Sequence, residues 1–305
     1  MKVRVGFGLG VGVGAQVDGD TLWSIIDACE EQGWDSMWFS ERVAGGLPDV
    51  LALMAAVAGR TRRLKFGPSV LVVPGRNPVL LAKELATIDV LSNGRLVPAF
   101  GLGSDAAREH EAFGVERGER AGRTDEAVEL MKRLWTEDNV THEGKYFTVH
   151  DLTVGPRPVQ QPTMDVWFGG HSPAAIRRVA RLGDGWLPSF VTAAEFRPKA
   201  DEIRKLAADN GRHIDDEHYG ALVAYLPEGM EPPEQLLRLL AATRKDSLDP
   251  LDIVAAGGPA GLRTRLEEFI EQGASKFVVL PLIPPTDWVG ELAKLREQVA
   301  LPLEN

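Results

Sequence analysis

Three loops of the chain place glycines and small polar residues directly after short apolar runs. The run at 166–168 is followed by Gly169, Gly170, His171 and Ser172, and Pro173 then opens a segment with helical periodicity. Glycines let the backbone approach an anion closely, and the N–H groups at a helix start attract phosphate. The sequence therefore predicts a phosphate site at 169–172, and the alternative is a tight turn with an ordinary helix cap.

A second loop follows Phe100 and contains Gly101, Gly103 and Ser104. With Ala106 it matches G-x-G-x-x-A, and residues 10–15 match the same pattern, so the pattern alone is weak. No helix opens directly after residue 10, as a dinucleotide-binding loop requires, and a nicotinamide dehydrogenase on a Rossmann sheet is kept only as an alternative. Close approach of the backbone to a flat ring explains the two glycines at least as well.

The third loop begins with Ser40 and Glu41, after the apolar run 36–39. A partly desolvated carboxyl at a strand end has a raised pKa and can exchange protons with a bound ring or substrate. The alternative for Glu41 is a structural ion pair with Arg42 or Arg63. Two loop histidines, His110 and His171, also follow strands and are weaker catalytic candidates. No His, Asp or Glu cluster has metal-ligand spacing, so no metal is expected.

These loops belong to a regular alternation of apolar runs and helical segments. The expected strands are 3–8, 36–39, 64–73, 96–100, 166–168, 186–187, 219–226 and 277–280. The expected helices are 20–32, 49–59, a segment from 78, 120–135, 173–182, 194–209, 234–244 with 260–272, and 287–299. Eight alternations predict a single α/β domain over 1–305, a parallel (β/α)₈ TIM barrel rather than an open sheet. The segments 102–119, after strand four, and 137–163, before strand five, exceed simple loops and are expected as insertions, the second on the surface.

Composition excludes several classes of protein. The chain is 44% hydrophobic with a net charge of −10, which disfavours nucleic acid and anionic membranes as partners. Cys29 is the single cysteine, which excludes a disulfide or a thiolate zinc site within one chain; its apolar helical spacing predicts burial. The glycines at 6–14 argue against a signal peptide, so a soluble, cytoplasmic protein is expected. The charge run 117–126 is typical of a solvated helix face.

Further segments occur in a fixed order along nearly the whole chain. They are EQGWDSMWFSE at 31–41, RNPVLLAKELAT at 76–87, LSNGRL at 91–96, EAFGV at 111–115, 120–126, EGKYF at 143–147, PRPVQQP at 156–162, 169–170 and GDGW at 183–186. Each is weak alone, but the ordered set is highly specific. By this set the chain resembles the luciferase-like monooxygenase superfamily, particularly its branch of oxidoreductases that depend on the deazaflavin coenzyme F420.

The resemblance implies a barrel whose mouth holds the tricyclic ring of F420, or of FMN in the alternative, with a small-molecule substrate stacked on the ring. It also implies a homodimer. A cis peptide between Ser69 and Val70 would support the ring, the loop after strand four would line the ring and its ribityl chain, and 169–172 would hold the phosphate. The cofactor-binding residues implied are Ser69, Val70, Gly101, Gly103, Ser104, Gly169, Gly170, His171 and Ser172.

The chain departs from many F420-dependent relatives at the end of strand two, where they carry Asp-His and this chain carries Ser40-Glu41. The catalytic proton transfer passes to these two residues or is absent. No lysine lies between Trp186 and Thr192 to match the substrate-phosphate ligand of the sugar-phosphate branch, so glucose 6-phosphate is not expected. Within this superfamily three functions stay open: hydride transfer with F420 in either direction, an FMN-dependent monooxygenase using O₂, and a non-catalytic flavin-binding paralogue.

Overall fold

The strands form one curled parallel sheet at the centre of the molecule. The computed structural model describes residues 1–10, 17–44, 46–104, 106–243 and 248–304. The strand order in the sheet is β10-β9-β11-β1-β2-β3-β4-β7-β8. The strands are β1 (Arg4–Leu9), β2 (Ser36–Phe39), β3 (Lys65–Val72), β4 (Ala99–Gly101), β7 (Trp167–Phe168), β8 (Gly185–Trp186), β9 (Gly220–Tyr225), β10 (Val254–Ala255) and β11 (Lys276–Pro281).

The two ends of this sheet meet. Isolated parallel bridges pair Trp186 with Tyr219 and Ser189 with Leu222, which connects β8 to β9 and leaves the short β10 outside the ring. The α/β class with a curled parallel sheet is thereby confirmed. Because β1, β2, β3 and β4 are neighbours in chain order, the 3-2-1-4 order of a Rossmann sheet is excluded. The match at 10–15 lies largely outside the described residues, as does position 105.

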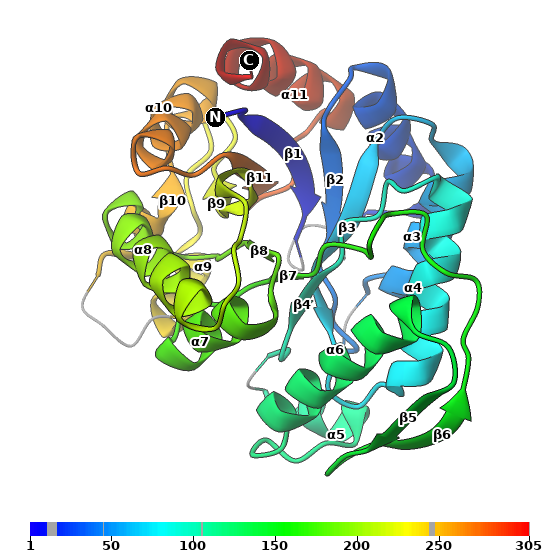
Figure 1. Ribbon diagram of the computed structural model, residues 1–305. Helices are drawn as coiled ribbons and strands as arrows, with labels where there is room; N and C mark the ends of the chain where they lie inside the picture. The colour runs from blue at the N-terminus through cyan, green and yellow to red at the C-terminus, as the bar shows by residue number, and fades with distance from the viewer. Residues whose placement is uncertain (11–16, 45, 105, 244–247, 305) are drawn as a thin grey trace.

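Helices surround the strands (Figure 1). They are α2 (Gly19–Glu31), α3 (Val50–Arg60), α4 (Pro78–Ser92), α6 (Arg120–Thr136), α7 (Pro173–Leu182), α8 (Ala193–Asp209), α9 (Glu234–Thr243), α10 (Gly258–Glu271) and α11 (Trp288–Leu295), which continues through a π-helical turn (Arg296–Ala300) into α12 (Leu301–Leu303). Short 3₁₀ turns precede β9 (Asp216–His218) and β10 (Pro250–Ile253). No helix among the described residues has both the length and the apolar character needed to cross a membrane.

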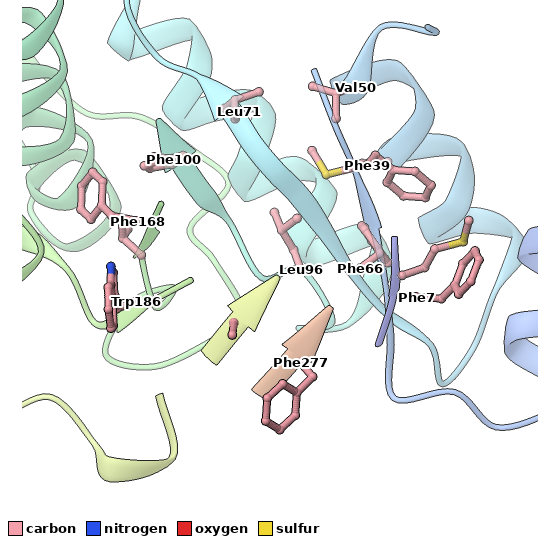
Figure 2. Packing of buried hydrophobic residues seen from close by; sticks show 14 of the residues in the cluster. Phe7, Phe39, Val50, Phe66, Leu71, Leu96, Phe100, Phe168, Trp186 and Phe277 are labelled. Atoms are coloured by element: carbon pink, nitrogen blue, oxygen red, sulfur yellow. The ribbon is translucent and has the colours of Figure 1, made fainter. Parts of the chain in front are cut away.

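Alternation along the strands separates two apolar layers. One set of side chains packs outward against the helices: Phe7 contacts Trp288 edge-on, Trp186 stacks on Phe196 of α8, and Phe277 meets Phe269 of α10. Figure 2 shows this layer, including Phe7, Phe277 and Trp186. The second set forms a smaller cluster of its own: Trp38, Ala99, Trp167, Leu187 and Val278.

The segments expected as insertions contain secondary structure that was not predicted. Helix α5 (Ala107–Phe113) lies within 102–119, and an antiparallel hairpin, β5 (Val140–Glu143) with β6 (Thr148–Leu152), lies within 137–163. The hairpin lies outside the ring of strands and helices (Figure 1). Its turn is held by Glu126 of α6, whose carboxylate accepts hydrogen bonds from the N–H groups of Tyr146 and Phe147.

The charge run 117–126 is the expected solvated face only in part. Arg117 is exposed, and Glu119 forms an ion pair with Arg123 one helical turn away. Arg120 and Thr124 are buried. Asp125 pairs with Arg178 and Arg181 of the neighbouring α7. The end of the run therefore joins two helices, because Asp125 meets opposite charges on α7. The burial expected for Cys29 is confirmed, and burial raises the pKa of its thiol far above the usual range.

Candidate functional site

Two connected chambers open at the carboxyl ends of the strands. The first, which we call the glycine chamber, has a volume of about 540 Å³. The second, the leucine chamber, has a volume of about 430 Å³. Both volumes lie in the range of roughly 300–1,000 Å³ that is usual for small-molecule sites. The residues that line both chambers are Ser69, Val70, Gly103, Ser189, Phe190 and Leu222.

The structure brings every predicted site residue except His110 to one of these chambers. Those lining the glycine chamber are Ser69, Val70, Gly101, Gly103, Gly169, Gly170, His171 and Ser172. Those lining the leucine chamber are Ser40, Glu41, Ser69, Val70, Gly103 and Ser104. Of the three residues predicted after Phe100, Gly101 lines the glycine chamber and Gly103 lines both chambers. Ser104 lines the leucine chamber alone.

Several glycines form a wall in which a side chain has no room. A Cβ atom added at Gly101 would lie 2.3 Å from Val70 Cγ2, and one added at Gly103 would lie 2.9 Å from Val72 Cγ1. Gly103 also has a φ of 78°, a conformation that L residues with side chains rarely adopt. The backbone at Gly101 and Gly103 therefore packs directly on the valine side chains at the end of β3, and neither position has room for a side chain.

The loop after β7 is held in place at the start of α7. Gly170 has a φ of 84°, and its carbonyl accepts a hydrogen bond of 2.8 Å from the Trp186 indole. Ser172 is the N-cap of α7, and its hydroxyl accepts from the Ala175 N–H at 3.2 Å. The first N–H groups of a helix lack partners within the helix, so this loop presents donors and a positive dipole end to the chamber.

The peptide bond between Ser69 and Val70 is cis, as the resemblance implied. At this point the pairing of β3 with β4 shifts register between Ser69 and Leu71. The Ser40 hydroxyl lies 3.4 Å from the Ser69 carbonyl, to which it donates. The bulge thus lies on the wall that the two chambers share, with Ser40 beside it.

Glu41 is an ion-pair residue, but its partner is not the one expected. Its carboxylate accepts from the Val72 N–H at 2.5 Å and from the Arg76 guanidinium, while Arg63 pairs with Glu30 instead. The Glu41 side chain is only 6% exposed. Burial raises its pKa, and the charge of Arg76 acts in the opposite direction. Glu41 therefore ties β2 to the end of β3, directly after the cis peptide.

Arg120 holds the loop after β4 by hydrogen bonds to its carbonyls, a role that the sequence did not indicate. Its guanidinium donates to the carbonyls of Leu102 at 3.2 Å and Ser104 at 2.9 Å. His110 also contacts the Ser104 carbonyl, through Nε2 at 2.8 Å, and it lines neither chamber. Its position indicates a loop contact rather than a catalytic role.

Other chamber residues were also missed. Phe190, after β8, has a φ of 56°, which is unusual for a bulky residue, and it lines both chambers. Its position after a strand was the available signal. The leucine chamber is completed by Leu236, Leu239 and Leu240 of α9, for which the sequence carried no such signal. Among the residues that the structure describes, no group of three His, Cys, Asp or Glu side chains could hold a metal ion.

The family of the chain follows from its sequence. Residues 3–227 match the model of the family described as luciferase-like monooxygenase. Because this match covers well over half of the chain, the chain belongs to the luciferase-like monooxygenase family.

Individual relatives carry more specific names. A protein of Kineococcus radiotolerans named F420-dependent glucose-6-phosphate dehydrogenase is 40% identical over 168 residues, 52% of this chain and 49% of that protein. One of the same name from Microbacterium testaceum is 30% identical over 271 residues, 82% of this chain and 76% of that protein. In its strongest alignments the chain spans about half the length of the curated relatives it matches.

A solved structure shares the fold. It is an F420-dependent secondary alcohol dehydrogenase in complex with an F420–acetone adduct, with a TM-score of 0.81 and 20% identity. The superposition covers 98% of each chain. At this identity the likeness establishes the barrel architecture alone.

Proposed function

We propose that this chain is an oxidoreductase that binds coenzyme F420 in the glycine chamber and moves a hydride between the coenzyme and a small organic molecule. The observation that carries the proposal is the glycine chamber, a space lined in part by glycines that borders the first turn of α7. The names of the relatives support F420 as the coenzyme. FMN is the alternative, which the description of the family as monooxygenases supports.

The residues of the chamber fit such a coenzyme. Gly101 and Gly103 line the chamber without presenting a side chain to it, which allows a planar ring to approach their backbone closely. The loop at 169–172 suits a phosphate, since it offers N–H donors at a helix start. Arg178 also lines the chamber, and Asp125 fixes its guanidinium at 2.5 Å.

When bound, the coenzyme would supply the carbon that donates or accepts the hydride. The role of the protein would be to hold the ring and the substrate together in the correct orientation and to limit water between them. The bulge at Ser69 and Val70 borders both chambers, so it would lie between the two reactants. We assign Ser40 and Glu41 to this junction, Glu41 as the residue that positions the bulge and Ser40 as the nearest hydroxyl.

The test is a titration of the apo-protein with F420 and with FMN, each oxidised and reduced, followed by coenzyme fluorescence. F420 is expected to bind at micromolar concentration or below, and FMN more weakly. Gly101→Ala should weaken F420 binding roughly tenfold or more, because overpacking costs about 1–3 kcal/mol. The matched control is Gly118→Ala, where an added Cβ has no atom within 4 Å.

Each outcome of the titration decides between the candidates. Binding of FMN but not F420 would replace the proposal by its alternative, and binding of neither would refute both. Binding of F420 without any turnover of organic substrates would favour a non-catalytic coenzyme-binding protein. The single domain over 1–305, the homodimer and the cytoplasmic location stay predictions of the sequence.

A further inference from the structure

We propose that the leucine chamber takes the substrate, and that the substrate is a neutral, largely apolar molecule with one carbinol or carbonyl group rather than a sugar phosphate. The inference rests on the proposed function. In the oxidative direction, the hydride would leave the carbinol carbon for the coenzyme and the hydroxyl proton would pass to water.

Five leucines make part of the lining of the leucine chamber apolar. Leu236, Leu239 and Leu240 come from α9, and Leu280 and Leu282 come from the end of β11. Leu239 is 63% exposed although it lines the chamber. An apolar ligand would remove this leucine surface from water, whereas a sugar would leave its hydroxyls without partners there.

Three serines line the leucine chamber close to its border with the glycine chamber. Ser69 and Ser189 line both chambers, and the Ser40 hydroxyl donates to the Ser69 carbonyl. This arrangement suits a molecule with a single polar group, placed at the junction where the hydride would be exchanged. The body of the molecule would then extend toward α9.

The charged residues that line the leucine chamber do not suit a phosphate. Both carboxylate oxygens of Glu41 are already engaged, by Val72 and Arg76. Among the described lining residues Arg42 is the one cation, and it is adjacent to Glu41 in the chain. A phosphate dianion moved out of water needs several charged partners to offset its desolvation. The relatives named after glucose 6-phosphate therefore differ from this chain in the substrate that we propose.

The first experiment measures turnover with F420 for secondary alcohols from 2-propanol to 2-octanol and for glucose 6-phosphate. The value of kcat/KM should rise by up to about fourfold for each added methylene until the chamber is filled. In Leu239→Ser and in Leu236→Ser, kcat/KM should rise less with each added methylene. The matched control is Leu91→Ser, because Leu91 on α4 is 59% exposed and lines neither chamber.

The second experiment separates this inference from the proposed function. Saturation-transfer NMR measures binding of 2-octanone and of glucose 6-phosphate to the chain without coenzyme. Binding of 2-octanone that Leu239→Ser weakens several-fold and Leu91→Ser leaves unchanged supports the inference, even if the F420 titration fails. Absence of 2-octanone binding, equal binding by the two variants, or preferred binding or turnover of glucose 6-phosphate would overturn it.

Discussion

The two ends of the barrel use their polar groups differently. At the amino ends of the strands, Asp35 lies 3.6 Å from Arg4 and 3.1 Å from Lys65, beside a cavity of about 210 Å³. At the carboxyl ends, the two chambers are larger and are walled by glycine backbone and leucines. In parallel barrels the carboxyl ends carry function and the amino ends carry stability.

Asp184 shows the difference most directly. It lies just before β8, where its carboxylate accepts from Arg212 at 2.8 Å, Lys132 at 2.6 Å and the Val166 N–H at 3.0 Å. Its interactions are thus satisfied within the protein, and they tie α6 to the segments before β7, before β8 and after α8. The loop at 169–172 on the opposite end instead directs N–H donors toward a chamber. The comparison predicts that substitutions at the two ends separate stability from binding.

The largest effect is expected for Asp184→Asn, which removes the charge that two cations share. We expect the free energy of unfolding to fall by about 1–3 kcal/mol. The reason is that hydrogen bonds between charged groups are lost at a side chain, that of Asp184, which is only 25% exposed. Urea unfolding measures this change, with Asp209→Asn at the exposed end of α8 as the control. F420 affinity of the folded protein should not change. A tenfold loss of affinity would contradict the division between the two ends.

The next effect concerns Arg120, at the carboxyl end. Arg120→Met leaves the carbonyls of Leu102 and Ser104 without this donor, so the loop after β4 should lose its fixed position. We expect F420 to bind about tenfold more weakly, which corresponds to roughly 1.4 kcal/mol. Arg263→Met, on the exposed face of α10, is the control in the same titration. Equal affinities for the two variants would show that the loop does not depend on Arg120.

Much of the barrel was predictable because its signals are local. The observed bounds of β2 and α7 are those expected, 36–39 and 173–182. In α7 the reason is explicit, since Ser172 caps the helix and Pro173 occupies its first turn. The glycine loops were predictable in the same way, because their place after a strand brings them to one end of the barrel.

The parts that were missed depend on contacts distant in sequence. Glu41 was expected to pair with Arg42 or Arg63, but Arg76 follows β3, which lies beside β2 in the sheet. The strands of the hairpin within 137–163 are only four and five residues long, and Val140 is their one fully buried residue, so periodicity did not reveal them. The periodicity of α9 predicted a helix, but it could not indicate that its leucines face a chamber.

A smaller effect should decide the role of Glu41. If it positions the bulge, Glu41→Gln should lower kcat/KM only a few-fold and leave the acid limb of the pH profile in place. Arg76→Gln breaks the same ion pair from the other side, so it should give a similar loss. If Glu41 transfers the proton, its glutamine variant should abolish the acid limb while Arg76→Gln only shifts it. The pH dependence of kcat/KM for the three proteins distinguishes these roles.

The smallest effect is expected away from both ends, at the hairpin. Burial alone would raise the pKa of Glu126, but the N–H groups of Phe147 and Tyr146 and the His142 side chain outweigh it and lower the pKa. A lowered pKa in the folded state stabilises the protein above the ordinary carboxyl range, and this contribution is lost as the pH falls through and below that range. Glu126→Gln should therefore flatten the acid dependence of stability by on the order of 1 kcal/mol. Urea unfolding from pH 6 to pH 3 tests this against Glu129→Gln, an exposed position on the same helix, and identical curves for the two variants would contradict it.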